Sequence, residues 1–147
     1  MIQKLRERMA KDESGFTLVE LLVVMLIIGL LAAIAIPSFF NQRDKAKDAT
    51  AKEAVRTAQT AAETYGTDNN GSYTGATVAK LQAIESTLNG ANALSVTPTS
   101  TGKGYTVTVT GKDTNNVFTI TRADAGTLSY TCTTVNTGGC PSTGTWN

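Results

Sequence analysis

One apolar segment near the amino terminus constrains this chain more than any other feature. In the run from Phe16 to Ile36, only Thr17 and Glu20 carry polar side chains. As a helix rising about 1.5 Å per residue, the run extends roughly 31 Å, the thickness of a bilayer's hydrocarbon core. The segment therefore predicts a membrane-spanning helix, with a carboxylate near its start that requires an explanation.

The polar stretch before this apolar run suggests its orientation. Basic residues flanking a span favour the cytoplasmic side, so the amino terminus is expected in the cytoplasm and the rest of the chain outside. The stretch has four basic residues, Lys4, Arg6, Arg8 and Lys11, against the acidic Glu7, Asp12 and Glu13.

Three interpretations of the apolar run compete. The first is an ordinary membrane anchor. The second is a secretory signal cut after Ala35, because Ala33-Ile34-Ala35 fits the small-x-small rule. The third is a helix that is kept after cleavage between Gly15 and Phe16. A carboxylate in hydrocarbon costs on the order of 3 kcal/mol and usually has a partner. Cleavage before Phe16 creates an ammonium close to Glu20 and places Glu20 in the first helical turn, where the helix dipole favours it. The carboxylate therefore favours the third interpretation.

The stretch GFTLVELLVVMLIIGLLAAIAIP, residues 15–37, resembles the amino terminus of type IV pilins and of the related pseudopilins of type II secretion. The resemblance rests on the glycine, the aromatic residue after it, the Glu five positions into the mature chain, the long apolar run and the proline. It covers about a quarter of the chain.

The resemblance implies a processing and assembly pathway. A prepilin peptidase would cleave after Gly15, Phe16 would be N-methylated, and Glu20 would neutralise the Phe16 amine of an adjacent subunit. Gly29 and Pro37 match positions where the helix of the family loosens in the filament. The implied partners are further copies of the chain in a helical filament, the prepilin peptidase, the pilus assembly machinery and, before assembly, membrane lipid.

A second helical pattern follows Pro37 without a break. Small apolar residues recur at three- and four-residue steps and form one stripe, while the charged residues, Asp48 and Glu63 among them, are assigned to the other faces. Pro37 is expected to kink the helix without ending it, and Gly66 to cap it. We expect one helix from Phe16 to Tyr65. The stripe comprises Ala51, Ala54, Val55, Ala58, Ala61, Ala62 and Tyr65.

Residues 67–147, called the head below, have a β-rich pattern. A short helix is expected at Thr77–Leu88, with Val78, Leu81, Ile84 and Leu88 inward. Four strand candidates follow: ALSVTPT, GYTVTVTGK, NVFTITRA and GTLSYTCT, the first the weakest because Pro98 suits an edge strand or a strand end. The prediction is an α+β fold of type IV pilin architecture: a long amino-terminal helix packed on the apolar face of a four-stranded antiparallel sheet, whose Thr-rich face sees solvent.

The two cysteines, Cys132 and Cys140, are expected to form a disulfide, because the head lies outside the cytoplasm. The resemblance to pilins also implies a carboxyl-terminal disulfide loop, often exposed. Trp146 is expected to be exposed or to dock on that loop.

The chain has no His, which excludes catalysis and metal sites that depend on imidazole, and the lysines form no stripe that favours nucleic acid. We therefore expect no enzyme activity, cofactor or metal.

These patterns predict four segments: a cleaved leader at 1–15, a membrane and filament-core part of the helix at 16–37, an amphipathic part at 38–66, and the head. The predicted function is that of the major subunit of a type IV pilus, held in the cytoplasmic membrane before assembly and extracellular afterwards. Alternatives are a pseudopilin, a minor pilin, or, from another class, a secreted or anchored binding module cut after Ala35.

Overall fold

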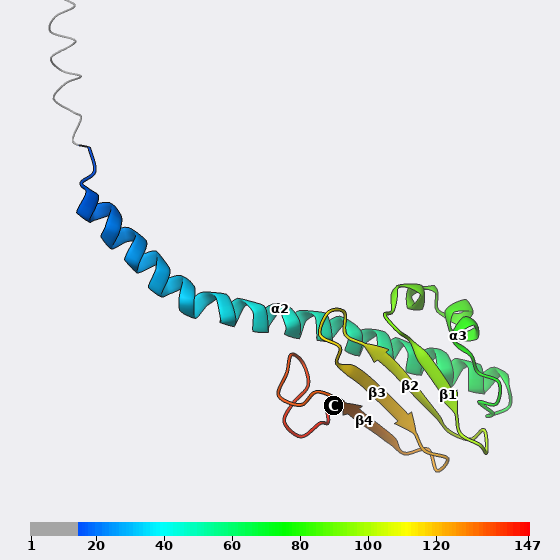
Figure 1. The fold of residues 1–147 in the computed structure, drawn as a ribbon. Coiled ribbons are helices and arrows are strands. Elements are labelled where there is room, and N and C mark those ends of the chain that lie inside the picture. The colour runs from blue at the N-terminus through cyan, green and yellow to red at the C-terminus, as the bar shows by residue number, and fades with distance from the viewer. Residues whose placement is uncertain (1–14) are drawn as a thin grey trace, which may run out of the picture. The chain divides into compact units, whose positions relative to one another are not determined.

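The computed structural model describes residues 15–147, and the chain divides into two compact units at Ser38 and Phe39. The described part of the first unit is residues 15–38, and the second unit is Phe39–Asn147. One helix, α2 (Leu18–Asp68), provides the backbone of the first unit and one layer of the second (Figure 1).

Helix α2 is continuous through Pro37, as predicted, but both of its ends differ from the expectation. It begins at Leu18 instead of Phe16 and ends at Asp68 instead of Tyr65. Gly66 is not the cap. A β-carbon on Gly66 would lie 2.6 Å from Cε1 of Tyr73, so glycine is needed there for close packing.

The carboxyl-terminal end of α2 is a Schellman motif. Asn70 adopts the left-handed conformation with φ of 57°, and the Gly71 N–H donates to the carbonyl of Gly66 over 2.7 Å. An Asn-Gly pair four residues beyond the expected cap therefore ends the helix.

The predicted helix at Thr77–Leu88 is two shorter elements, α3 (Val78–Ile84) and the 3₁₀ helix η1 (Ser86–Gly90). Thr77 caps α3, since its hydroxyl accepts from the Lys80 N–H. Glu85 has extended backbone angles and its carboxylate accepts from the Thr87 N–H over 3.1 Å, which starts η1. Leu81 and Leu88 are buried, whereas Ile84 is 39% exposed because the break turns it outward.

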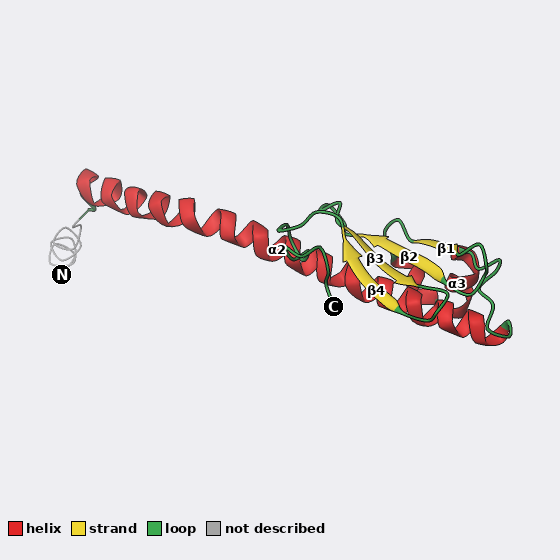
Figure 2. Cartoon of the chain, turned by 90° about the horizontal axis from the view of Figure 1, so that it is seen from below, coloured by secondary structure: helices red, strands yellow, loops and turns green. Residues whose placement is uncertain are grey.

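The four predicted strands form one antiparallel sheet in the order β1-β2-β3-β4. As predicted, the strand containing Pro98 lies at an edge. The sheet lies along the carboxyl-terminal half of α2, and α3 lies beside the β1 edge (Figures 1 and 2). The strands are β1 (Ser95–Pro98), β2 (Tyr105–Thr110), β3 (Val117–Arg122) and β4 (Leu128–Cys132).

The core forms between α2 and one face of this sheet. Alternate residues of β2 and β3 point toward the helix, and cross-strand neighbours such as Val107 and Ile120 pair directly. The stripe on α2 is buried as predicted, except that Ala54 is half-buried. The Thr-rich face of β2 and β3 is half-buried and not fully exposed. Buried side chains of the sheet are Tyr105, Val107, Val109, Phe118 and Ile120.

Glu63 lies between α2 and the sheet and not on an outer face as expected. Its carboxylate accepts hydrogen bonds from the Tyr73 hydroxyl at 2.6 Å and the Tyr105 hydroxyl at 2.8 Å. Arg122 is 3.2 Å from the same carboxylate. Burial, followed by the bond to Glu63, raises the pKa of Tyr73 to about 12, and the same causes raise the pKa of Tyr105 further.

We predict that spectrophotometric titration will show two of the four tyrosines ionising well above pH 10. A pKa raised in the folded state adds stability that is complete below the unfolded value. The free energy of unfolding should therefore fall as the pH rises above about 10. Glu63→Gln should lower the Tyr73 pKa, whereas Glu53→Gln, at an exposed position of α2, should not. Four tyrosines titrating together near pH 10 would refute the network.

Candidate assembly site and surface loop

The predicted cleavage site lies just before α2. Gly15 and Phe16 have no helical or strand structure and are exposed, with 80% of Phe16 accessible. The rest of the predicted leader, residues 1–14, lies outside the described residues. The bond between Gly15 and Phe16 is therefore in accessible, non-helical backbone.

Glu20 forms a capping box with Thr17 at the start of α2. The Thr17 N–H and hydroxyl both donate to Oε2 of Glu20 at 2.8 Å, and the Glu20 N–H donates back to the Thr17 hydroxyl at 3.2 Å. Among residues 15–147, Oε1 of Glu20 makes no hydrogen bond and remains available to a further donor. The Thr-x-x-Glu spacing is a helix-start signal that the sequence carries in addition to the glycine, aromatic and glutamate pattern.

The capping box gives Glu20 a role that does not depend on cleavage. Because its carboxylate caps the helix within one chain, an ordinary membrane anchor would also account for its presence. Pairing with the Phe16 amine of another subunit remains a prediction.

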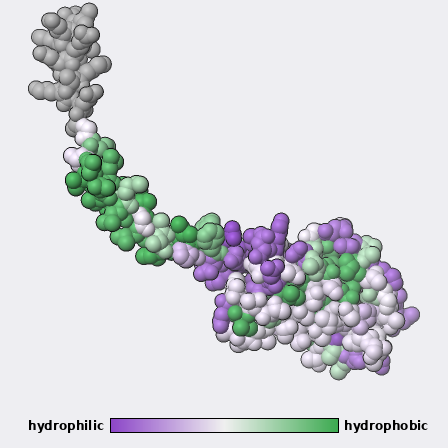
Figure 3. Space-filling model, in the orientation of Figure 1, coloured by the Kyte–Doolittle hydropathy of each residue, from purple (hydrophilic) through white to green (hydrophobic). Residues whose placement is uncertain are grey.

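The part of α2 from Leu18 to Phe40 is apolar on all its faces, apart from Glu20 and Ser38. Its large apolar side chains from Leu18 to Phe40 are exposed, and the first buried residue of the helix is Asp48. Figure 3 shows this run of hydrophobic surface. By length and composition, α2 is able to cross a membrane. Gly29 and Pro37 both lie within the helix. Apart from the adjacent residues and the nearby helix backbone, no atom of the described residues would lie within 4 Å of a β-carbon on Gly29.

The predicted disulfide joins Cys132, the last residue of β4, to Cys140. It closes a loop of residues 133–139, called the disulfide loop below. Val135 in this loop is 46% exposed, and Asn136 has φ of 59°. The loop is thus an exposed element held at its base by a covalent bond.

Asp48 anchors the disulfide loop to α2, although the sequence analysis had placed it on an outer face. It is fully buried, and its carboxylate accepts from the Thr114 hydroxyl, from Nδ2 of Asn116 at 2.8 Å and from the Gly139 N–H at 2.7 Å. A β-carbon on Gly138 would lie 2.2 Å from the carboxylate, so the loop approaches through its glycines. Three donors satisfy the buried charge.

Trp146 docks on the sheet and on α2, and is neither exposed nor placed on the disulfide loop alone. Its indole N–H donates to the Thr131 carbonyl at 2.9 Å. Its ring meets Phe118 and Tyr130 edge to face, and the cations of Lys52 and Arg56 lie over it. The carboxyl terminus is therefore fixed to the same surface as the disulfide loop.

This architecture, a long apolar amino-terminal helix continued under a four-stranded antiparallel sheet, is the α+β fold of a pilin. Comparison with known proteins agrees. Residues 10–36 match the family model described as the prokaryotic N-terminal methylation motif. No solved structure is significantly similar to the chain.

Two similar proteins align with most of the chain. The type IV wide pilus major component PilA4 of Thermus thermophilus is 31% identical over 84% of this chain and 83% of its own length. A fimbrial protein of Pseudomonas aeruginosa is 33% identical over 79% of this chain and 83% of its own length. The chain belongs to the family of type IV pilins and type II secretion pseudopilins.

A third similar protein shares only part of the chain. The type II secretion system core protein G of Pseudomonas aeruginosa is 39% identical over 40% of this chain, and the alignment spans 42% of that protein. The methylation motif and the apolar helix fit anchoring in the inner membrane before assembly into an extracellular pilus.

We predict that Asp48→Ala destabilises the head by about 2–4 kcal/mol, because three donors lose their acceptor. Denaturant unfolding of the oxidised protein measures this change. The disulfide should also be reduced faster, since the Gly139 anchor is lost. Glu53→Ala, at an exposed position of the same helix, serves as the control and should change stability by less than about 0.5 kcal/mol. Equal stabilities for the two variants would show that Asp48 anchors nothing.

Proposed function

We propose that the chain is the major structural subunit of a type IV pilus and acts by assembly, not by catalysis. The observation that carries this proposal is the extent of two alignments with pilus subunits, PilA4 and the fimbrial protein. Each continues beyond the amino-terminal helix and covers 83% of the relative, whereas the alignment with core protein G covers 42%. The exposed disulfide loop, which a filament of this chain would display, also supports it.

In the proposed pathway, the chain waits in the inner membrane with its head outside. A prepilin peptidase removes residues 1–15, and Phe16 is N-methylated. The apolar part of the helix, residues 16–37, then moves from lipid into the filament core, where Gly29 and Pro37 loosen it. Residues 38–66 support the head, which forms the outer coat.

Glu20 sets the axial register in this pathway. An unpaired carboxylate in an apolar filament core is costly, so a subunit is stable only where Glu20 meets the Phe16 ammonium of a neighbour. The structure contributes one point to this proposal: Oε1 of Glu20 has no partner within residues 15–147, while Oε2 caps the helix.

A pseudopilin of a type II secretion system is the second candidate, because identity to core protein G reaches 39% over 59 residues. A minor pilin, which shares the same helix, is a third candidate.

We expect the chain to be the dominant protein of long fibres sheared from the cell surface. A chain confined to the cell envelope would instead support the pseudopilin.

Variants at the capping box separate the two roles of Glu20. Glu20→Gln keeps a side-chain acceptor for Thr17 but removes the charge, whereas Thr17→Val removes the capping hydroxyl and keeps the charge. We predict that Glu20→Gln reduces the fibre yield by at least about tenfold, with cleavage of residues 1–15 intact. Thr17→Val should reduce it far less. Normal fibre yield from Glu20→Gln would contradict charge pairing, and a Thr17→Val defect of equal size would assign the effect to capping.

A further inference from the structure

The chain changes character abruptly where the second unit begins. Phe39 and Phe40 are 67% and 46% exposed, and charged residues follow at once. The Arg43 guanidinium lies 5.0 Å from the centre of the Phe40 ring and remains exposed. Figure 3 shows hydrophilic surface directly following the hydrophobic run of α2. These residues mark the change from an apolar surface, which suits lipid, to a polar surface, which suits water.

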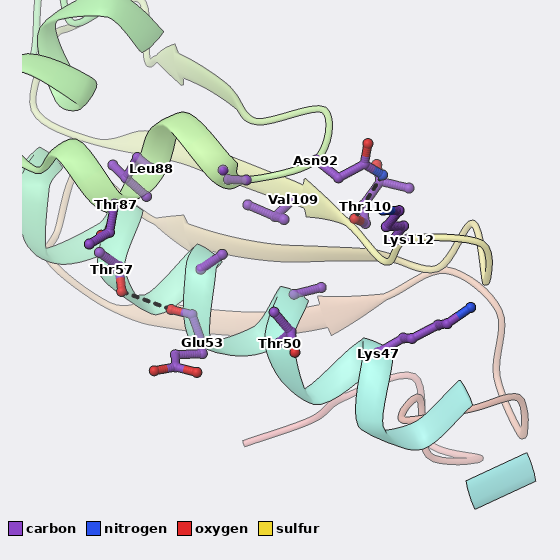
Figure 4. A pocket seen from close by; sticks show the side chains of 14 residues that line it. Lys47, Thr50, Glu53, Thr57, Thr87, Leu88, Asn92, Val109, Thr110 and Lys112 are labelled. Atoms are coloured by element: carbon purple, nitrogen blue, oxygen red, sulfur yellow. Dashed lines mark hydrogen bonds between the residues drawn. The ribbon is translucent and has the colours of Figure 1, made fainter. Parts of the chain in front are cut away.

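Four basic residues flank this border: three follow Phe40 closely on α2, and one is on the β2–β3 loop, beside Lys47. They are Arg43, Lys45, Lys47 and Lys112, called the basic collar below. Lys47 and Lys112 lie at the same end of a groove between α2 and β2 (Figure 4). The ion pair between Lys47 and Asp113 holds the loop against the helix. The hydrogen bond from Lys47 and its charge, and more weakly the charges of Lys112 and Arg43, keep the pKa of Asp113 below its usual range.

The collar has an excess of positive charge. Its four cations are accompanied by two carboxylates, the half-buried Asp44 and the exposed Asp113, while the carboxylate of Asp48 is buried and satisfied by three donors. The far part of the second unit has the opposite balance, with three basic residues, Lys80, Lys103 and Arg122, against four acidic ones, Glu63, Asp68, Glu85 and Asp124. The positive charge of the unit is thus concentrated next to the apolar run.

The distance along the helix places this charge at the level of lipid phosphates. From Leu18 to Ile36, a helix rises roughly 28 Å, which brings Phe39 and Phe40 to the edge of a hydrocarbon core of about 30 Å. Residues 43–47 then lie roughly 5–10 Å further along, within the headgroup region. Basic residues on this outer side run against the usual preference for the cytoplasmic side, so they call for a partner.

We propose that the basic collar binds the phosphate groups of anionic phospholipids in the outer leaflet of the inner membrane, with Phe39 and Phe40 at the hydrocarbon border. Arg and Lys form charge-assisted hydrogen bonds with phosphate oxygens, and anionic lipid surfaces attract clustered cations. The contact seats the unassembled subunit in the membrane and must break when the subunit enters a filament. It applies equally to a pilin and a pseudopilin, because it depends only on insertion of α2.

The test uses the full chain in bilayers of phosphatidylcholine containing spin-labelled phosphatidylglycerol or spin-labelled phosphatidylcholine. Electron spin resonance measures the relative association of the two lipids with the protein. We compare Lys45→Gln/Lys112→Gln with the charge-matched control Lys80→Gln/Lys103→Gln, whose changes lie far from the apolar run. Residues 1–15 are identical in all variants, so any attraction they exert cancels. Fluorescence of Trp146 confirms that each head is folded.

We expect the wild-type chain to prefer phosphatidylglycerol by about threefold or more at low salt, since each cation near an anionic surface contributes to the attraction. The collar variant should lose most of this preference, and the control should keep it. Salt at about 0.5 M should weaken the preference of the wild-type chain and of the control. An unchanged preference in the collar variant would overturn the proposal. So would a normal lipid preference combined with loss of fibres, which would assign the collar to acidic groups of a second copy.

Discussion

The rest of the structure depends on the contact between the small-residue stripe of α2 and the apolar face of the sheet. A single sheet with one apolar face needs a second layer, and here one helix provides it. Val55, Ala58 and Ala62 are fully buried, and their short side chains let the strands approach the helix closely. The larger residues of the core come from the sheet, chiefly Tyr105, Phe118 and Ile120.

The same helix has two surfaces with different partners. Beyond Asp48 one face is buried and the others are polar, as expected for a helix that packs under a sheet. Before Asp48 no side chain of the described helix is buried, and the run from Leu18 to Phe40 is apolar on all sides, apart from Glu20 and Ser38. An exposed apolar surface of this extent requires lipid or other protein. A membrane anchor that later becomes a filament core satisfies both requirements in turn.

Periodicity was sufficient to predict the main elements. The three- and four-residue steps from Ala51 to Tyr65 predicted the buried stripe, and the strand candidates GYTVTVTGK and NVFTITRA contain β2 and β3. The errors arise where side chains distant in sequence meet. Asp48 and Glu63 looked like solvated charges, because their partners lie on loops and strands far along the chain. Gly66 looked like a cap, because its contact with Tyr73 is tertiary.

The region around Glu20 carries two signals, one from the resemblance to a family and one from local helix capping. The resemblance to pilins implies an assembly role for Glu20, and the local Thr-x-x-Glu pattern adds a capping role that the structure shows. Trp146 is a different case, since an isolated aromatic residue near the carboxyl terminus has no periodicity. Only the folded chain shows that it packs on Phe118 and Tyr130.

The proposed pathway requires that the apolar helix is kept after cleavage and becomes the means of assembly. The intact mass and amino-terminal sequence of the chain in sheared cell-surface material measure this directly. We predict a chain that begins at N-methylated Phe16 and sediments with fibres. A soluble, monomeric chain that begins at Ile36 would contradict it, because the helix would then be a discarded signal and the head a secreted binding module.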